Sequence, residues 1–277
     1  MRLRFLGTGT SAGVPSIGID PISDDPRDVR LRTSAVLEFT DPTGQERVIL
    51  IDAGPDLRQQ AMTAGLTRLD AILFTHNHVD HTWGLDEVRR FNVMMQRPID
   101  LYADDKTLQH LRRVYQHIFE AHANVQKSFV ATVIARRIQP FRSFELYGLK
   151  ITPIELLHGR LPILGFRFDV ASRGLFAGGA GDPDGSILPF AYCTDVSAIP
   201  PDTWPYLDGL EVLVLDALRR RKHPTHFTLD QSVNVAERVG AGKTFFVHMN
   251  HELVHAEVEA ELPENVRLAY DGLVVGE

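Results

Sequence analysis

Three histidines and one aspartate fall within six positions of the sequence, directly after the apolar run 71–74 (AILF). They form the pattern His76-x-His78-x-Asp80-His81. A strand end followed by a tight loop can aim all four side chains into one space, and imidazole together with carboxylate suits Zn²⁺, Mn²⁺ or Fe²⁺. Four ligands are more than a single open catalytic metal takes from one loop, so the pattern predicts two metals that share the cluster. The alternative is a polar turn that is merely rich in histidine.

Three further metal-competent residues follow short apolar runs later in the chain. They are His158 after 151–157, Asp195 after 191–194 and His248 after 244–247. Open sheets collect ligands in this way, because loops converge where strands end. Each residue taken singly has an alternative role as a surface or capping residue. As an ordered set behind the first cluster, the three predict the remaining ligands of one centre.

Strands and helices alternate along both halves of the chain, and candidate ligands come from both halves. This pattern predicts an α/β fold, with two mixed sheets flanked by helices in an αββα sandwich and the metals at one edge of the sheets. We expect a single domain over residues 1–277. Strands are expected near 2–6, 34–40, 47–52, 71–75, 130–138, 150–157, 164–170, 212–215 and 244–247, and helices near 56–64, 84–94, 105–117, 229–239 and 252–261.

Composition limits the classes of protein to which the chain can belong. With 277 residues, 44% of them hydrophobic, it can bury the core of one α/β domain. No apolar run approaches the length of a membrane span, and the first residues read as a strand and not as a signal peptide. Cys193 is the single cysteine, which excludes an intramolecular disulfide framework. These features predict a cytoplasmic protein in which Cys193 is a small buried residue.

Charge argues against an extended nucleic-acid interface. The net charge is −7, whereas broad nucleic-acid binding usually requires a basic face. A local basic run, 219–222 (RRRK), stands just before His223 and His226, and either attracts anions beside the metals or is a solvated loop. The glycine-rich segment 172–188 has no clear period and reads as a hairpin, a lid or a disordered loop.

The ligand pattern resembles that of the metallo-β-lactamase superfamily, with its HxHxDH loop and later His, Asp and His. The motif is specific for the fold and much less so for the substrate. The resemblance implies two divalent metal ions, with Zn²⁺ as the first choice and Mn²⁺ as the second. It assigns His76, His78 and His158 to one metal, assigns Asp80, His81 and His248 to the other, and makes Asp195 the bridge.

Other segments resemble the phosphodiesterase branch of that superfamily, and most closely the PhnP-like family. This family is named for a phosphodiesterase of phosphonate breakdown that opens a ribosyl cyclic phosphate. The resembling segments are 3–15 (LRFLGTGTSAGVP), 25–34 (DPRDVRLRTS) and 270–272 (YDG). PhnP-like proteins usually have a cysteine cluster after the Gly-Val-Pro sequence, which holds a structural zinc with a later histidine. This chain has no cysteine there, although His251 matches the histidine, so we expect no third zinc.

The expected chemistry is hydrolysis by a metal-bridging hydroxide. Two metals bridged by Asp195 and a water would lie about 3.5–4 Å apart and lower the pKa of that water toward neutrality. Asp80 can orient the hydroxide as well as bind a metal. His226 is not needed as a ligand, so it is free to bind a phosphate oxygen or to protonate the leaving alkoxide, the alternative being a loop or supporting histidine.

Other polar residues of the chain have supporting roles in this interpretation. Asp52 and Asp216 each follow an apolar run, and we expect them to orient metal-bound imidazoles, the alternative being N-caps of the following helices. Four more histidines lack ligand spacing to the cluster and are expected at packing or surface positions. They are His110, His117, His122 and His255.

The leading hypothesis is a dinuclear phosphodiesterase acting on a small, cyclic or nucleotide-like phosphodiester. A tRNA 3′-processing endonuclease of the same superfamily is the second hypothesis, although the sequence has no basic arm of the kind that grips tRNA. A thioester or lactam hydrolase is the third, and a non-enzymatic binding module would be favoured by missing ligands, of which there are none. The expected binding partner is the small phosphodiester substrate, and no membrane association is expected. The sequence leaves open whether the protein forms a homodimer.

Overall fold

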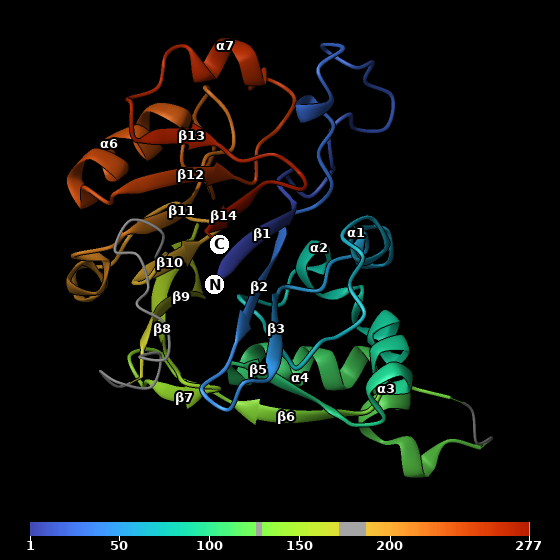
Figure 1. The fold of residues 1–277 in the computed structure, drawn as a ribbon. Coiled ribbons are helices and arrows are strands. Elements are labelled where there is room, and N and C mark those ends of the chain that lie inside the picture. Colours follow the sequence, from blue (N-terminus) through green and yellow to red (C-terminus); the bar gives the residue numbers. More distant parts are fainter. Residues whose placement is uncertain (126–128, 172–186, 277) are drawn as a thin grey trace.

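Two β-sheets of seven strands each face one another in the computed structural model, and helices cover their outer faces (Figure 1). The structure describes residues 1–125, 129–171 and 187–276. The predicted hairpin or lid at 172–188 therefore lies almost entirely outside the described residues. This two-sheet arrangement confirms the predicted αββα class.

The first sheet is formed mainly by the N-terminal half of the chain, in the order β14-β1-β2-β3-β4-β5-β6. Its first four strands in that order pair antiparallel, and β3 to β6 pair parallel. The strands are β1 (Arg2–Gly7), β2 (Ser34–Thr40), β3 (Glu46–Ile51), β4 (Ala71–Leu73), β5 (Ile99–Ala103), β6 (Val133–Arg137) and β14 (Val274–Gly276).

The second sheet has the order β13-β12-β11-β10-β9-β8-β7. Its strands β7 to β10 pair antiparallel, and β10 to β13 pair parallel. The strands are β7 (Phe144–Leu146), β8 (Leu149–His158), β9 (Leu161–Val170), β10 (Phe190–Cys193), β11 (Val212–Asp216), β12 (Lys243–Val247) and β13 (Val266–Leu268).

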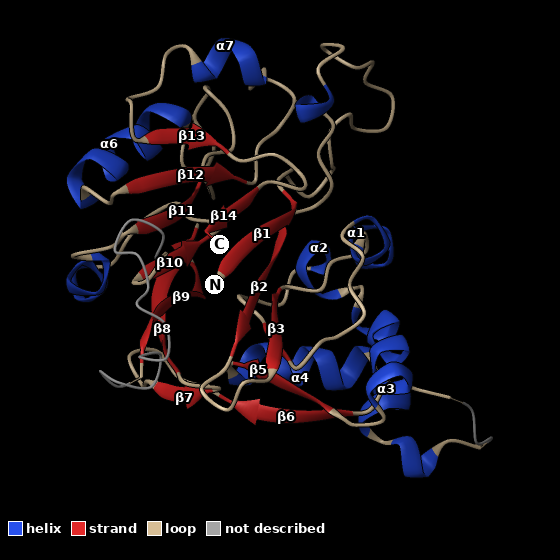
Figure 2. Ribbon diagram, viewed as in Figure 1, coloured by secondary structure: helices blue, strands red, loops and turns tan. Residues whose placement is uncertain are grey.

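Helices flank the pair of sheets on both sides (Figure 2). The helices of the N-terminal half lie on the side of the first sheet, and α6 and α7 lie on the side of the second sheet. The helices are α1 (Leu57–Thr63), α2 (Val79–Thr82), α3 (Arg89–Met95), α4 (Asp105–Val114), α5 (Gln116–Phe119), α6 (Leu229–Val239) and α7 (His255–Glu259). Short 3₁₀ turns cover Pro26–Asp28, Leu85–Val88, Ala121–Ala123 and Pro201–Leu207. Among the described residues, no helix is both long and apolar enough to cross a membrane.

The alternation of side chains along a strand explains the layers. Leu37 and Ile49, on β2 and β3, belong to the apolar cluster between the sheets. Their neighbours Val36 and Leu50 point the other way, into the cluster beneath the helices of the first sheet. Because both faces of these strands are buried, they are apolar almost throughout instead of alternating with polar residues.

Helix α6 has strong local start and stop signals. The Thr228 side chain accepts a hydrogen bond from the Gln231 backbone N–H, and the Gln231 side chain accepts from the Thr228 N–H, which forms a capping box. Gly240 ends the helix in the left-handed conformation (φ 64°), which glycine adopts without strain. This cap also fixes the chain direction two residues after His226.

Several predicted boundaries are wrong. The helix expected at 84–94 is a 3₁₀ turn followed by α3, and the helix expected at 105–117 ends at Val114, one residue before Tyr115, whose backbone is not helical. The helix expected at 252–261 is shortened to α7. The sequence does not predict the strands β5, β7, β13 and β14, because they are short and lack the continuous apolar run that marks the equally short strands β4, β11 and β12.

Candidate metal centre

Three of the predicted metal-binding residues lie at or just after the ends of strands, and the other four lie in the segment that follows β4. Asp195 follows β10 after one intervening residue, His248 directly follows β12, and His158 is the last residue of β8. Asp52, Asp195 and His248 have φ angles of 61°, 59° and 61°, in the left-handed region that non-glycine residues rarely adopt. Three such residues at one site indicate backbone strain that is maintained because it turns these side chains toward a common point.

The segment after β4 forms a short helix and not the tight loop that the motif predicted. His78 precedes α2 with an extended backbone, and Asp80 and His81 lie within the helix. The turn approaches the chain after β3 closely, since the His81 carbonyl accepts from the Ala53 N–H at 2.8 Å. A Cβ added to Gly54 would lie 2.2 Å from the Asp80 carbonyl oxygen, so only glycine permits this contact.

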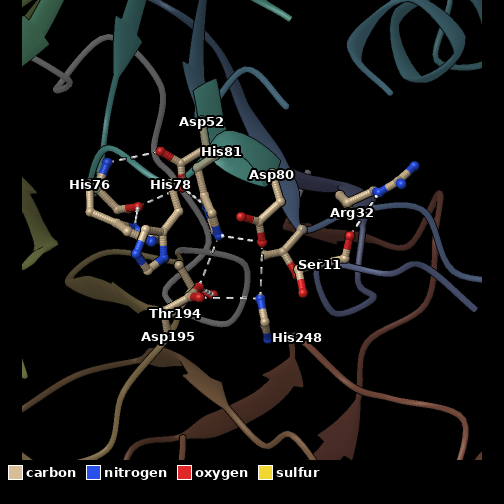
Figure 3. Close-up of polar contacts among 12 residues, drawn as sticks. Ser11, Arg32, Asp52, His76, His78, Asp80, His81, Thr194, Asp195 and His248 are labelled. Carbon is tan, nitrogen blue, oxygen red and sulfur yellow. Dashed lines mark hydrogen bonds and ion pairs between the residues drawn. The ribbon is translucent and has the colours of Figure 1, made fainter. Parts of the chain in front are cut away.

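The seven residues fall into the two groups that the family resemblance implied. His76, His78 and His158 form one group, and Asp80, His81, Asp195 and His248 form the other, with the potential ligand atoms of each group within 4.8 Å of one another. Figure 3 shows the second group converging, with His76 and His78 beside it.

Distances within the second group show a tight cluster around Asp195. The His81 Nε2 atom lies 3.2 Å from Asp195 Oδ2 and 3.3 Å from Asp80 Oδ2. The His248 Nε2 atom lies 3.2 Å from Asp195 Oδ1 and 3.7 Å from Asp80 Oδ2. In the first group, the ring of His78 lies 4.5 Å from that of His76 and 5.0 Å from that of His158.

The hydrogen-bond partners of the rings fit metal binding. The Nδ1 atom of His158 donates to the Thr225 carbonyl oxygen at 2.8 Å, and the Nδ1 atom of His81 is 2.7 Å from Asp52 Oδ2. The Thr75 hydroxyl donates its one hydrogen to Asp52 and therefore accepts from Nδ1 of His76. In these rings the lone pair is left on Nε2, the atom that faces the site.

Buried atoms without partners give the same result. The Nε2 atoms of His76, His81 and His248 are buried and have no hydrogen-bond partner among the described residues, because the Asp195 oxygens 3.2 Å from His81 and His248 are close to them without hydrogen-bond geometry. Buried polar atoms are normally satisfied, so such a group is explained by an ion that these atoms bind. The donor set of imidazole and carboxylate suits Zn²⁺ or Mn²⁺.

Electrostatics divides the histidines into two kinds. Burial lowers the pKa of His76, and lowers that of His158 to about 4, so both rings are neutral at pH 7 and able to bind a metal. Burial is the largest single influence on His248 and lowers its pKa, but the carboxylates of Asp195, Asp80 and Asp216 together outweigh burial and raise the pKa to about 9. The two carboxylates of the second group thus favour a cation at this position.

His226 lies beside both groups. Its Nδ1 atom is 2.9 Å from Asp216 Oδ2, and its ring lies 4.6 Å from the rings of both His158 and His248. Burial lowers its pKa to about 3. Potential ligand atoms of His158, Asp195 and His226 also lie within 4.8 Å of one another, so His226 is close enough to act on whatever the centre binds.

The supporting aspartates contact imidazoles as expected, although not in identical ways. Asp52 bonds to His81, a candidate ligand, whereas Asp216 bonds to His226 and lies 4.0 Å from Nδ1 of His248. Neither aspartate is the N-cap of a helix in the structure. Both are fully buried.

Three threonines that the sequence pattern does not mark as site residues orient the site. Thr75 links Asp52 to His76, Thr194 donates to Asp195 Oδ2 at 2.7 Å, and the Thr225 carbonyl orients His158. Each immediately precedes a candidate site residue. For Thr75 and Thr194 that position is the available signal, because a hydroxyl next to a ligand can reach the ligand or its neighbour, whereas Thr225 acts through a backbone carbonyl that any residue would supply.

The basic run 219–222 provides fewer available cations than its sequence suggests. Arg220 pairs with Glu261 at 2.7 Å and Arg221 with Glu252 at 2.5 Å. Arg219 instead donates to two backbone carbonyls of its own loop. Of the two alternatives for this run, the ion pairs favour a solvated loop over anion attraction for Arg220 and Arg221.

The segment after Gly-Val-Pro is joined to the chain after His248 by hydrogen bonds. The buried Arg30 guanidinium donates to the carbonyls of Asn250 and Leu253 and pairs with Asp28 at 2.7 Å. Asp28 also accepts from the His255 backbone N–H. These contacts join the two segments that a cysteine and histidine zinc site would join, and the absence of a third zinc stays a prediction.

The remaining histidines lie outside the two ligand groups. His117 pairs with Asp86 at the surface, His122 is exposed, and His255 is buried beside Glu259. His110 is partly buried, and its Nε2 atom has no partner among the described residues. Cys193 is fully buried, as predicted, and burial raises the pKa of its thiol to about 12.

Comparisons with known proteins agree with this architecture. Residues 47–249 match the family described as the beta-lactamase superfamily domain. The fold superimposes with a TM-score of 0.83 on the crystal structure of a diphosphatase from the PhnP family, which is 39% identical and covers 100% of this chain and 97% of that one. The chain belongs to the PhnP family of the beta-lactamase superfamily. It thus contains a hydrolase domain of the predicted superfamily and fold.

Two curated relatives of this PhnP-family chain are longer than it is. It is 32% identical over 280 residues to an octanoyltransferase of Porphyromonas gingivalis, a match that covers 99% of the chain and 51% of the relative. It is 28% identical over 171 residues to a ribonuclease Z of Methanopyrus kandleri, with coverage of 60% and 50%. The chain spans about half the length of these two relatives.

Proposed function

We propose that the protein is a dinuclear metal-dependent phosphodiesterase that hydrolyses a small, cyclic or nucleotide-like phosphodiester. The observation that carries the proposal is the position of Asp195 between the two ligand groups. Its carboxylate oxygens lie 3.2 Å from the Nε2 atoms of His81 and His248, and it also lies within 4.8 Å of a potential ligand atom of His158. Two divalent ions held there would supply a water of lowered pKa and a Lewis acid for the phosphoryl oxygens.

The residues of the chain have distinct tasks in this reaction. Asp80, whose carboxylate faces His81 and His248, orients the attacking water. His226 is held by Asp216 through Nδ1, so its Nε2 atom is the one available to the phosphate or to the leaving oxygen. The buried aspartates keep the imidazoles in fixed orientations, which preserves the geometry of the site during the reaction.

The diphosphatase relative supports cleavage of a phosphorus–oxygen bond, and diphosphate esters belong to the proposed substrate range. Ribonuclease Z relatives support the second hypothesis, tRNA 3′ processing. The octanoyltransferase name supports an acyl substrate less well, because acyl transfer through a protein thiol requires an accessible, activated cysteine. Cys193 is neither exposed nor activated.

Metal analysis combined with a substrate panel tests the proposal. The protein loaded with Zn²⁺ or Mn²⁺ should contain two ions per chain and should hydrolyse bis(p-nitrophenyl) phosphate or a cyclic nucleotide. One ion, or three, in the fully loaded protein would contradict the dinuclear assignment. Efficient hydrolysis of a thioester or lactam with no phosphodiesterase activity would contradict the substrate class.

A further inference from the structure

His223 lies one step farther from the metal centre than His226. The His226 ring is 4.6 Å from the rings of His158 and His248, and the His223 ring is 5.2 Å from that of His226. His223 is partly exposed, whereas His226 is buried. These four rings form a path of imidazoles from the two candidate ligands, through His226, to the partly exposed His223.

The hydrogen bonds of His223 are opposite to those of the candidate ligands. Its Nδ1 atom accepts from the Thr225 backbone N–H at 3.3 Å and is 3.1 Å from the Thr225 hydroxyl. A backbone N–H can only donate, so Nδ1 of His223 must be the acceptor and its hydrogen lies on Nε2. The ligands present a lone pair on Nε2, whereas His223 presents an N–H donor, which binds an anion and not a metal.

Arg219 adds a positive charge close enough to act on the His223 ring, whose pKa is lowered by burial first and then by His226 and Arg219. Its Nε and Nη2 groups donate to the carbonyls of Arg221 and Lys222, each at 3.2 Å, so the guanidinium has a fixed orientation. Within residues 1–125, 129–171 and 187–276, Nη1 of Arg219 has no hydrogen-bond partner and no carboxylate pairs with this arginine. Arg220 and Arg221 differ in this respect, because Glu261 and Glu252 hold them.

We propose that His223 and Arg219 form a second anion subsite, which binds the phosphoryl group next to the one being hydrolysed and makes the site selective for diphosphate diesters. The inference rests on the proposed phosphodiesterase function and names the substrate class within it. A group that binds phosphate as a hydrogen-bond donor beside a fixed guanidinium suits this role, since charge-assisted hydrogen bonds are the stronger ones. His226 then acts at the phosphorus that reacts, and His223 acts on its neighbour.

The test uses His223→Asn, because an Asn Oδ1 atom can still accept from the Thr225 N–H while the Nε2 donor is lost. Calorimetric titration of the metal-loaded protein compares AMP with α,β-methylene-ADP, which has one more phosphoryl group and is not hydrolysed. Wild-type protein should bind α,β-methylene-ADP more tightly. In His223→Asn this affinity should fall about ten- to hundred-fold, which corresponds to one hydrogen bond to a charged group, while the affinity for AMP should change by less than about twofold.

Matched variants test whether both residues belong to the subsite. His223→Gln places an amide N–H near the original Nε2 position and should recover part of the affinity for α,β-methylene-ADP. Arg219→Gln should show the same selective loss as His223→Asn, whereas Arg221→Gln, in the same loop but paired with Glu252, should bind both nucleotides as the wild type does. Equal wild-type affinities for AMP and α,β-methylene-ADP would overturn the proposal.

A positioning role is the alternative for His223, because Thr225 links it to His158. Elemental analysis of His223→Asn decides between the two roles, since loss of a metal would show that His223 supports the ligand and is not part of a subsite. Turnover adds a separate readout. The KM for P1,P2-di(adenosine-5′) diphosphate should rise in His223→Asn, while that for bis(p-nitrophenyl) phosphate should not. If the wild-type enzyme hydrolyses neither compound, the phosphodiesterase proposal fails, and the two binding measurements still decide the subsite.

Discussion

Individual histidines at this site differ in the ring nitrogen that their neighbours leave available. A carbonyl or carboxylate beside Nδ1, as in His158 and His81, leaves the lone pair on Nε2. A backbone N–H that donates to Nδ1, as in His223, leaves the ring hydrogen on Nε2. The partner of one nitrogen therefore decides whether a histidine can bind a metal or an anion.

The ligand role of His81 can be tested directly. Replacing it by alanine removes the Nε2 atom that lies between Asp80 and Asp195, so the second ion should be lost and phosphodiester hydrolysis should fall below detection. Elemental analysis should find about one ion per chain in the variant. His117→Ala, at an exposed position paired with Asp86, is the control and should keep both ions. Two ions and full turnover in His81→Ala would show that the assignment is wrong.

His226 should matter for turnover and not for metal content. If it protonates the leaving oxygen, His226→Ala should lower kcat about 10²–10⁴-fold, the range typical of general acid–base catalysis. The loss should be smaller for bis(p-nitrophenyl) phosphate, whose leaving group needs little protonation, than for an ester with an alkyl alcohol. An equal loss for both substrates would indicate phosphate binding instead. Loss of an ion would show that His226 is itself a ligand.

At the scale of elements, the sequence predicts the positions of the candidate ligands better than their local structure. The apolar runs before His76, Asp195 and His248 are sufficient to place these residues at strand ends, because a strand that is buried on both faces is continuously apolar. The left-handed backbone at Asp195 and His248 cannot be predicted, since aspartate and histidine are enriched in this region among non-glycine residues but still adopt it only rarely. It exists because the surrounding strands enforce it.

The supporting contacts are the other part of the site that the sequence conceals. Thr225 orients His158 from 67 positions away in the chain, and such a contact depends on how two loops meet. Short strands such as β13, three residues long, escape prediction for a related reason, since they are specified by the neighbouring strand and not by a pattern of their own.

The segment with Asp28 and Arg30 offers a test of element-level stability. Arg30 is fully buried, and breaking a buried ion pair leaves an uncompensated charge, so Asp28→Asn should lower the free energy of unfolding by about 3–5 kcal/mol. The neighbouring pair of Arg27 with Asp25 is more exposed, and Arg27→Ala should cost about 0–1 kcal/mol. Urea denaturation of both variants makes the comparison. Similar costs for the two would show that the Asp28–Arg30 pair does not anchor this segment.

At the scale of the whole molecule, one carboxyl group connects the two ends of the chain. Asp271 accepts hydrogen bonds from the Thr8 hydroxyl and from the Leu31 N–H, and burial raises its pKa from 3.8 to about 6. A raised pKa means that the folded protein binds the proton more tightly than the unfolded chain does. The stabilisation is complete below pH 4 and is lost as the pH rises through about 6.

Asp271→Asn should remove this pH dependence. Asn cannot ionise, so the variant should gain up to about 3 kcal/mol relative to wild type between pH 4 and pH 7, the equivalent of the pKa shift. Urea denaturation of both proteins at these two pH values measures the difference, and other titrating groups cancel because both proteins contain them. An unchanged difference between the two proteins across this range would show that Asp271 ionises in the folded state as it does in the unfolded chain.

The charge of the whole chain separates the two phosphodiester hypotheses. A net charge of −7 repels a polyanion, and in the basic run 219–222 two of the three arginines are already paired with glutamates. Long nucleic acids gain most of their affinity from many phosphate contacts, whereas a small diester needs only the metals and one or two donors. We therefore expect efficient hydrolysis of a small diester and weak binding of pre-tRNA whose affinity falls steeply with salt. Turnover of bis(p-nitrophenyl) phosphate and cleavage of pre-tRNA should be measured with the same metal-loaded preparation. Specific 3′ cleavage of pre-tRNA at nanomolar enzyme would favour the endonuclease. It would show that the protein has a tRNA-binding surface, contrary to what its net charge and the paired arginines lead us to expect.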